Sequence, residues 1–108
     1  MKLIFVLFRR SDLNHDQSLD QWSGEQHTSL VRTIPGLKKW IQNHAITLPS
    51  DAAADGIGEL WFDSTAAMEQ AMNSPQMAAA VEDAKRFLDL ERTYAVAVDE
   101  KIILNTLK

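Results

Sequence analysis

LIFVLF, residues 3–8, is a continuous apolar run without a polar position. Side chains along a strand point alternately to its two faces, so the run predicts a strand that is buried on both faces. It is too short to span a membrane, and the Arg9-Arg10 pair after it does not fit a signal peptide. The chain has no cysteine, which fits a reducing compartment, and we expect a cytoplasmic protein.

The first predicted helix follows this strand. Asn14 offers an N-cap, and Gln17 stands three residues later, as in a capping box. We expect the helix to run from about His15 to Thr33 and to be stopped by Pro35-Gly36.

The second predicted helix consists of two pieces. Ser64 or Thr65 caps the first piece. Ser74-Pro75 restarts the helix, since proline is well placed in a first turn, and the second piece runs to about Arg86.

Three further strands are predicted from their apolar and β-branched residues. They are Leu37–Thr47, Gly56–Asp63 and Thr93–Val98, with Ile102–Leu104 as a candidate extension of the last. The segment Leu48–Asp55, rich in alanine and aspartate, is expected to be a loop.

The resulting order is β-α-β-β-α-β in a single domain, residues 1–108. With right-handed crossovers, this order predicts an α+β, ferredoxin-like fold: a four-stranded antiparallel sheet with both helices on one face. The first strand has no polar face, so the other side of the sheet must also be buried. A second copy of the chain is the simplest cover, and we expect a homodimer.

Composition excludes several classes of function. The net charge of −4 does not favour nucleic acid or an anionic membrane as a partner. Without cysteine there is no disulfide framework and no thiol nucleophile. The three histidines show no metal-ligand spacing, so we expect neither a metal nor another cofactor.

His27 is the first candidate for chemistry. On a helical wheel started at Leu19, His27 falls at about 80°, between Ile34 at about 60° and Val31 at about 120°. It therefore faces the sheet. Two interpretations remain open: a core histidine bonded to a backbone carbonyl, or an acid/base group in a pocket.

His44 and its neighbour Asn43 are the next candidates, because either could hold a substrate oxygen. They point to opposite faces of their strand, and the sequence does not decide which of them faces the helices. His44 is equally consistent with a strand-end residue near solvent. His15, in the first turn of its helix, is expected to have no role.

Other residues in the strands favour a pocket or an interface. Glu59 lies inside an apolar strand, and we expect it to form an edge or interface ion pair. Gly56 and Gly58 share one face, which leaves room there for another group. Five aromatic residues are candidates to line a ligand pocket, although each is also compatible with a plain core position: Trp22, Trp40, Trp61, Phe62 and Phe87.

An ordered set of segments resembles the EthD family across nearly the whole chain. The matching segments are Trp22–His27, Pro35–Leu37, Gln42–His44, Asp55–Ser64, Ser74-Pro75 and Arg86–Asp89. The family usually has His-Gly-Pro where this chain has His27-Thr28-Ser29, so the helix break that Gly-Pro gives is not expected here.

The resemblance implies a ferredoxin-like subunit that dimerises into an α+β barrel, with a cavity between helices and sheet for a small apolar or aromatic ligand. We expect a cofactor-free enzyme that isomerises, cyclises or dehydrates a small cyclic or aromatic carbonyl compound. His27 would be the acid or base, and Asn43 or His44 would hold the substrate oxygen. The alternatives are a non-catalytic ligand-binding accessory dimer and a cofactor-independent monooxygenase.

Overall fold

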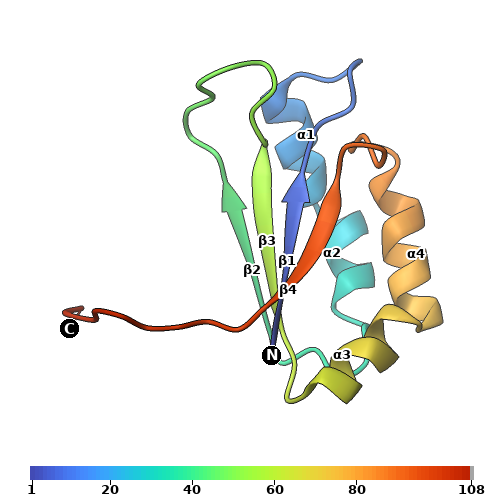
Figure 1. The fold of residues 1–108 in the computed structure, drawn as a ribbon. Helices are drawn as coiled ribbons and strands as arrows, with labels where there is room; N and C mark the ends of the chain where they lie inside the picture. Colours follow the sequence, from blue (N-terminus) through green and yellow to red (C-terminus); the bar gives the residue numbers. More distant parts are fainter. Residues whose placement is uncertain (108) are drawn as a thin grey trace.

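The computed structural model describes residues 1–107, which form one antiparallel sheet with helices on one side (Figure 1). The elements in chain order are β1 (Lys2–Leu7), α1 (His15–Trp22), α2 (Glu25–Val31), β2 (Lys39–His44), β3 (Gly56–Trp61), α3 (Thr65–Met72), α4 (Pro75–Ala84) and β4 (Tyr94–Val98). The strands lie in the order β2-β3-β1-β4. The predicted ferredoxin-like βαββαβ fold is confirmed. None of the helices within residues 1–107 is long and apolar enough to cross a membrane.

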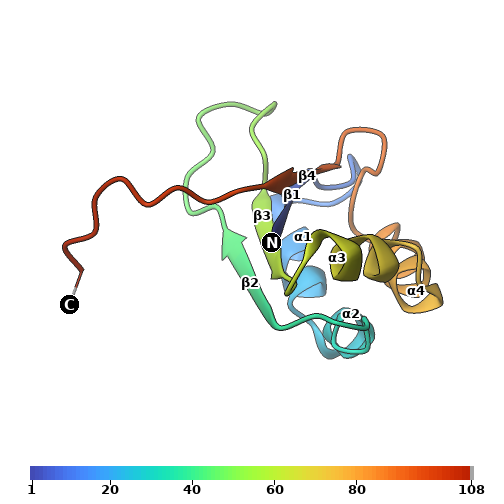
Figure 2. The same cartoon turned by 60° about the horizontal axis from the view of Figure 1, so that its bottom comes forward.

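Strand β1 lies in the interior of the sheet and has two apolar faces. Leu3 and Leu7 point toward the helices and are buried. Ile4 and Val6 point to the other face, which no helix covers (Figure 2). On that face Tyr94 and Val96 of β4 lie beside them and are 54% and 45% exposed. The sheet therefore has an uncovered apolar face, as the sequence predicts.

The first helix is interrupted, which the sequence analysis did not predict. Instead of one helix from His15 to Thr33, α1 ends at Trp22 and α2 begins at Glu25. Gly24 is the N-cap of α2 in an extended conformation, and glycine is the poorest helix former after proline. The predicted capping box at the start of α1 is present. Helix α2 itself is unbroken at Thr28, as predicted from the absence of the family's Gly-Pro at this position.

The strands are shorter than predicted, and the chain after β4 does not extend the sheet. Strands β2 and β3 occupy residues 39–44 and 56–61 rather than 37–47 and 56–63. Ile102–Leu104 lies outside the sheet, with Ile103 90% exposed (Figure 1). The register explains this: Val98 pairs with Lys2, so the neighbouring strand ends where the extension would begin.

A buried carboxylate, Asp55, links α1 to the sheet through His15, a structural contact that the sequence analysis did not predict. Asp55 accepts hydrogen bonds from the Arg9 amide and guanidinium, both at 2.9 Å. His15 Nδ1 lies 2.6 Å from Asp55 Oδ1, and its Nε2 lies 2.7 Å from the Ala45 carbonyl oxygen. Both neighbours are acceptors, so only a protonated imidazole can donate to both.

We expect His15→Gln to reduce stability most at acidic pH. The hydrogen bond to Asp55 raises the pKa of His15 above its usual value. A raised pKa stabilises the fold fully below about pH 6.5, and this stabilisation is lost as pH rises through the folded-state pKa. Thermal unfolding of both proteins should therefore show a gap in Tm at about pH 5.5 that narrows by about pH 9. A gap that widens with pH would contradict the assignment.

Candidate functional site

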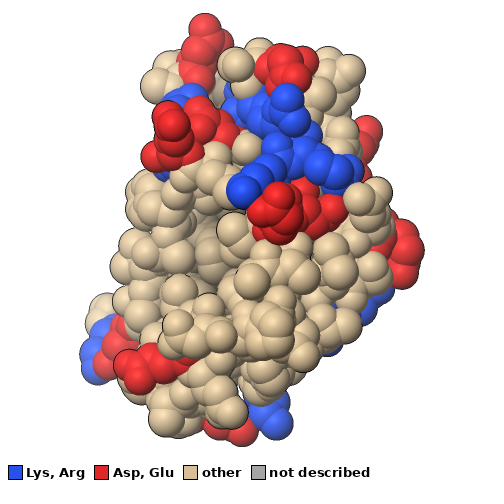
Figure 3. Space-filling model, turned by 90° about the vertical axis from the view of Figure 1, so that its right-hand side faces the viewer, with Lys and Arg blue, Asp and Glu red and all other residues tan. Residues whose placement is uncertain are grey.

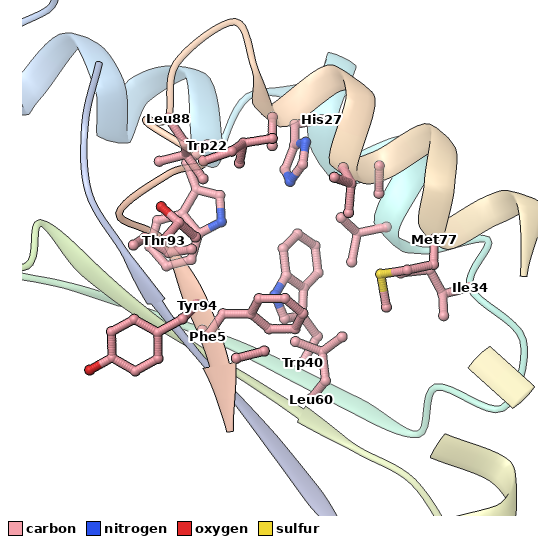
Figure 4. Close-up of a pocket in the computed structure, with 18 residues that line it drawn as sticks. Phe5, Trp22, His27, Ile34, Trp40, Leu60, Met77, Leu88, Thr93 and Tyr94 are labelled. Carbon is pink, nitrogen blue, oxygen red and sulfur yellow. The ribbon is translucent and has the colours of Figure 1, made fainter. Parts of the chain in front are cut away.

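A cavity of about 260 Å³ lies between the sheet and helices α2 and α4 (Figure 4). Phe5 and Leu60 line it from the sheet, and Val31, Met77 and Ala80 line it from the helices. Figure 3 shows the side of the molecule that carries α4 and β4, where charged residues gather at the upper end and uncharged side chains surround a hollow. The cavity is thus a mostly apolar site within one subunit.

His27 reaches this cavity from α2. His27 is only 6% exposed, and its ring packs edge to face on the Phe87 ring, with the ring centroids 5.0 Å apart. Nδ1 lies 3.0 Å from Asp83 Oδ2 on α4. Within residues 1–107, Nε2 has no hydrogen-bond partner, and the ring extends toward the cavity interior (Figure 4). The partner of His27 is a carboxylate, not the backbone carbonyl of the core interpretation.

Asp83 is held by further donors. Arg86 Nε donates to Asp83 Oδ1 at 2.7 Å, and Arg86 Nη2 donates to Oδ2 at 3.0 Å. Gln26 also donates to Oδ1 at 3.0 Å. The Arg86 guanidinium keeps the pKa of Asp83 below its usual value despite burial. The carboxylate is therefore ionised and fixed in position next to His27.

Burial governs the charge of His27. Its pKa is lowered from the usual value, because the loss of hydration outweighs the opposing effect of Asp83. A neutral ring that donates from Nδ1 to Asp83 leaves the Nε2 lone pair in the cavity. This arrangement presents a base at neutral pH, and the neighbouring carboxylate would stabilise the imidazolium after proton uptake.

The structure brings three of the predicted aromatic residues to this site. Trp22 and Trp40 line the cavity, and Phe87 packs against His27. His44 lies on the helix-facing side of β2, where it stacks on Trp22 with ring centroids 5.0 Å apart. His44 is exposed and its Nε2 lies 2.8 Å from Gln42 Oε1, so it supports Trp22 rather than lining the cavity.

The structure separates the other predicted residues from the cavity. Asn43 lies on the uncovered sheet face, where it donates to Glu59 at 2.9 Å. Trp61 shares that face, beneath the ammonium group of Lys2. Phe62 follows β3 and is buried in the core. Glu59 forms the ion pair expected of it, with Lys2 at 2.9 Å, but on a central strand rather than an edge strand.

Asp83 and Arg86 are residues of the candidate site that the sequence analysis did not identify. A signal was present: Asp83 lies three residues after the buried Ala80 and one before the buried Ala84, so it borders the buried stripe of α4. Within residues 1–107, no three His, Cys, Asp or Glu side chains lie together as metal ligands.

This geometry defines the class of protein: a ferredoxin-like α+β domain with an apolar cavity and a carboxylate–histidine pair. The EthD domain model matches residues 10–91, and the chain belongs to the EthD family. An EthD family protein from Bacillus halodurans has a similar structure, with a TM-score of 0.74, 24% identity, and coverage of 93% of this chain and 97% of that one.

Two other solved structures share the fold. A dimeric protein of unknown function with a ferredoxin-like fold from Bacteroides fragilis has a TM-score of 0.65 at 14% identity, covering 88% of this chain and 90% of that one. A dimeric ferredoxin-like protein of unknown function from Thermobifida fusca has a TM-score of 0.61 at 18% identity, covering 88% and 85%. Comparison with curated proteins gave no match.

We expect Gly56→Ala to destabilise the protein by about 1–3 kcal/mol through overpacking. A Cβ at Gly56 would lie 2.6 Å from Trp22 Cζ3, closer than any real contact. Gly58→Ala is the matched control, since its Cβ would lie 3.4 Å from Trp22. Urea unfolding should show a clearly larger loss for the first variant. Equal losses would mean that the Trp22 ring does not rest on Gly56.

Proposed function

We propose that this EthD family chain is a cofactor-free enzyme that moves a proton on a small cyclic or aromatic carbonyl compound. The observation that carries the proposal is the His27–Asp83 pair, whose free Nε2 faces an apolar cavity. Buried carboxylate–histidine pairs place a base in a defined tautomer and orientation, which is what proton transfer requires.

In the proposed reaction, His27 Nε2 takes a proton from carbon next to the substrate carbonyl, and the electron pair of the C–H bond passes into an enolate. Asp83 stabilises the imidazolium without becoming protonated. Return of the proton to a different atom of the substrate gives isomerisation. Attack of the enolate on a second carbonyl of the same molecule gives cyclisation, with the proton delivered to the new alkoxide.

The cavity favours a neutral and compact substrate. Pockets for drug-sized ligands measure about 300–1,000 Å³, and this cavity, at about 260 Å³, is smaller. Its lining contains no lysine, arginine, aspartate or glutamate within residues 1–107. A carboxylate or an amine would lose its hydration there without gaining an opposite charge. A ring ketone or phenol would bury apolar surface at little cost.

We further propose that the chain acts as a single domain and a homodimer. The uncovered sheet face presents Ile57, Tyr94 and Val96 at 41%, 54% and 45% exposure. A contiguous apolar face of this kind marks an interface, and two-fold self-association is the commonest way to cover it. Two structures of similar fold are described as dimeric, which supports the proposal.

The dimer proposal predicts that no stable monomer exists at micromolar concentration. The dimer buries the uncovered sheet face of each subunit, and an interface of this kind should resist dilution. Equilibrium sedimentation should therefore give twice the chain mass of 12.2 kDa. Replacing Val96 by lysine should shift the equilibrium toward monomer, because it places a charge within the buried face. A folded wild-type monomer would contradict the proposal.

The catalytic proposal can be tested with 1-indanone, a small bicyclic ketone whose C2 protons are next to the carbonyl. The protein should accelerate exchange of these protons for deuterium in D₂O, followed by NMR. His27→Gln should lower the catalysed rate by about 100-fold or more, as for loss of a general base. Asp83→Asn should also lower it, because an amide no longer enforces the tautomer that leaves Nε2 free.

The pH profile provides a second readout of this experiment. The pKa of His27 lies below its usual value, so the rate should fall only when pH drops below about 6.5. His15→Gln, which alters a histidine outside the cavity, is the matched control at about pH 8 to 9, where its expected loss of stability is smallest, and there it should keep the wild-type rate. Exchange that is equal in wild type and His27→Gln would refute His27 as the base. Binding of the ketone without exchange would favour the accessory ligand-binding role.

A further inference from the structure

Trp22 has a fixed position on the cavity wall. It is the last residue of α1 and is 4% exposed. Its six-membered ring rests over Gly56 and Gly58, where the absence of side chains leaves space for it. His44 stacks on it with an interplanar angle of 23°, and Gln42 Nε2 donates to its backbone carbonyl at 2.9 Å. The indole is therefore held in place by contacts with β2 and β3 and cannot turn freely.

The indole nitrogen of Trp22 faces the centre of the cavity (Figure 4). Within residues 1–107 this N–H has no hydrogen-bond partner, and it is not sealed within the protein. A buried tryptophan N–H ordinarily finds an acceptor, because leaving it without one costs free energy. An oriented donor of this kind, in a cavity that also contains the free nitrogen of His27, points to a ligand that carries an acceptor.

We propose that the Trp22 indole N–H donates a hydrogen bond to an oxygen of the ligand in this cavity, and so selects neutral compounds with a carbonyl oxygen. This inference rests on the proposed function, which requires a ligand in the cavity, and it identifies the Trp22 N–H as the group that recognises the ligand's oxygen. An indole N–H is a donor only, so the ligand must supply the acceptor. During proton removal by His27, the same bond would stabilise the charge that develops on that oxygen.

The charges around the cavity favour a neutral ligand. An anionic ligand would meet no cationic side chain on the lining within residues 1–107. Asp83, the carboxylate that contacts His27, already accepts hydrogen bonds from His27, Gln26 and Arg86, so a cationic ligand gains little from it. The hydroxyl of Thr93, also on the lining, accepts a hydrogen bond from the Phe8 amide. Unlike this rotatable hydroxyl, the Trp22 N–H has a direction fixed by the position of its ring.

The three tryptophans of the chain provide an internal comparison. Trp22 and Trp40 line the cavity, whereas Trp61 lies on the opposite sheet face. Each gives one indole N–H signal in a ¹H–¹⁵N spectrum of the full chain. The variants Trp40→Phe and Trp61→Phe assign two signals and leave the third to Trp22, so the assignment does not depend on a Trp22 variant.

The experiment titrates labelled protein with 1-indanone and, separately, with indane, the same bicycle without the carbonyl. We expect 1-indanone to move the Trp22 N–H signal downfield, as hydrogen bonding does. Indane should leave that signal without a downfield shift while perturbing methyl signals of the cavity. Trp61 should not respond to either compound. Trp22→Phe should weaken binding of 1-indanone by about three- to tenfold, as for loss of one hydrogen bond, and leave indane binding within about twofold.

The outcomes separate this inference from the proposed function. If the Trp22 signal responds equally to both compounds, or only the Trp40 signal moves downfield, Trp22 is not the oxygen donor, and His27 is still tested by deuterium exchange. If neither compound perturbs any cavity signal, both the inference and the proposed cavity ligand are refuted. A downfield shift at Trp22 in a His27→Gln protein that no longer exchanges deuterium would support both assignments independently.

Discussion

The apolar character of strand β1 on both of its faces is the constraint on which the rest of the structure depends. Leu3 and Leu7 anchor the helix side of the sheet, and Phe5 between them lines the cavity. Ile4 and Val6 give the opposite face its apolar centre. One strand in the interior of the sheet thus contributes to a cavity on one side and to an uncovered apolar patch on the other. A polar residue in place of Ile4 or Val6 would remove the need to cover the second face without affecting the first, because successive side chains point to opposite faces.

The contact between His27 and Asp83 has both a structural and a chemical consequence. It joins α2 to α4, the helices that line the cavity opposite the sheet. A buried carboxylate is costly unless it is paired and hydrogen-bonded, and Arg86 supplies both conditions. Because Arg86 satisfies Asp83, the carboxylate stays ionised and His27 need not be charged to keep it so. Burial can then lower the pKa of His27, which keeps the ring available as a base.

Signals that act over a few residues made most of the fold predictable, whereas the site depends on contacts between elements. Caps and strand composition give the order of elements, because they involve neighbours in the chain. The wheel identifies the buried position of His27, but it could not reveal the break at Gly24, since the buried face is nearly the same with or without it. Strand alternation shows that Asn43 and His44 point to opposite faces but not which of them faces the helices. Only the packing of α1 on the sheet decides that His44 does. In the sequence, Asp83 looks like a solvent-exposed helix residue, and only its contact with His27 of α2 in the folded protein shows otherwise.

The polar atoms of the cavity set it apart from a packing defect. Cavities that arise from imperfect packing in a core are lined by apolar atoms and cost stability without offering a ligand any orientation. Here every side-chain nitrogen or oxygen that is sealed from solvent within residues 1–107 has a hydrogen-bond partner. The Nε2 of His27 and the indole nitrogen of Trp22 are not sealed, have no partner within the same residues, and both face the cavity (Figure 4). One is an acceptor and the other a donor, so a ligand that satisfies both must present a proton and an acceptor at separate atoms. A carbonyl compound with an adjacent C–H group fits this pair, because its oxygen can accept from Trp22 while His27 takes the proton from its carbon.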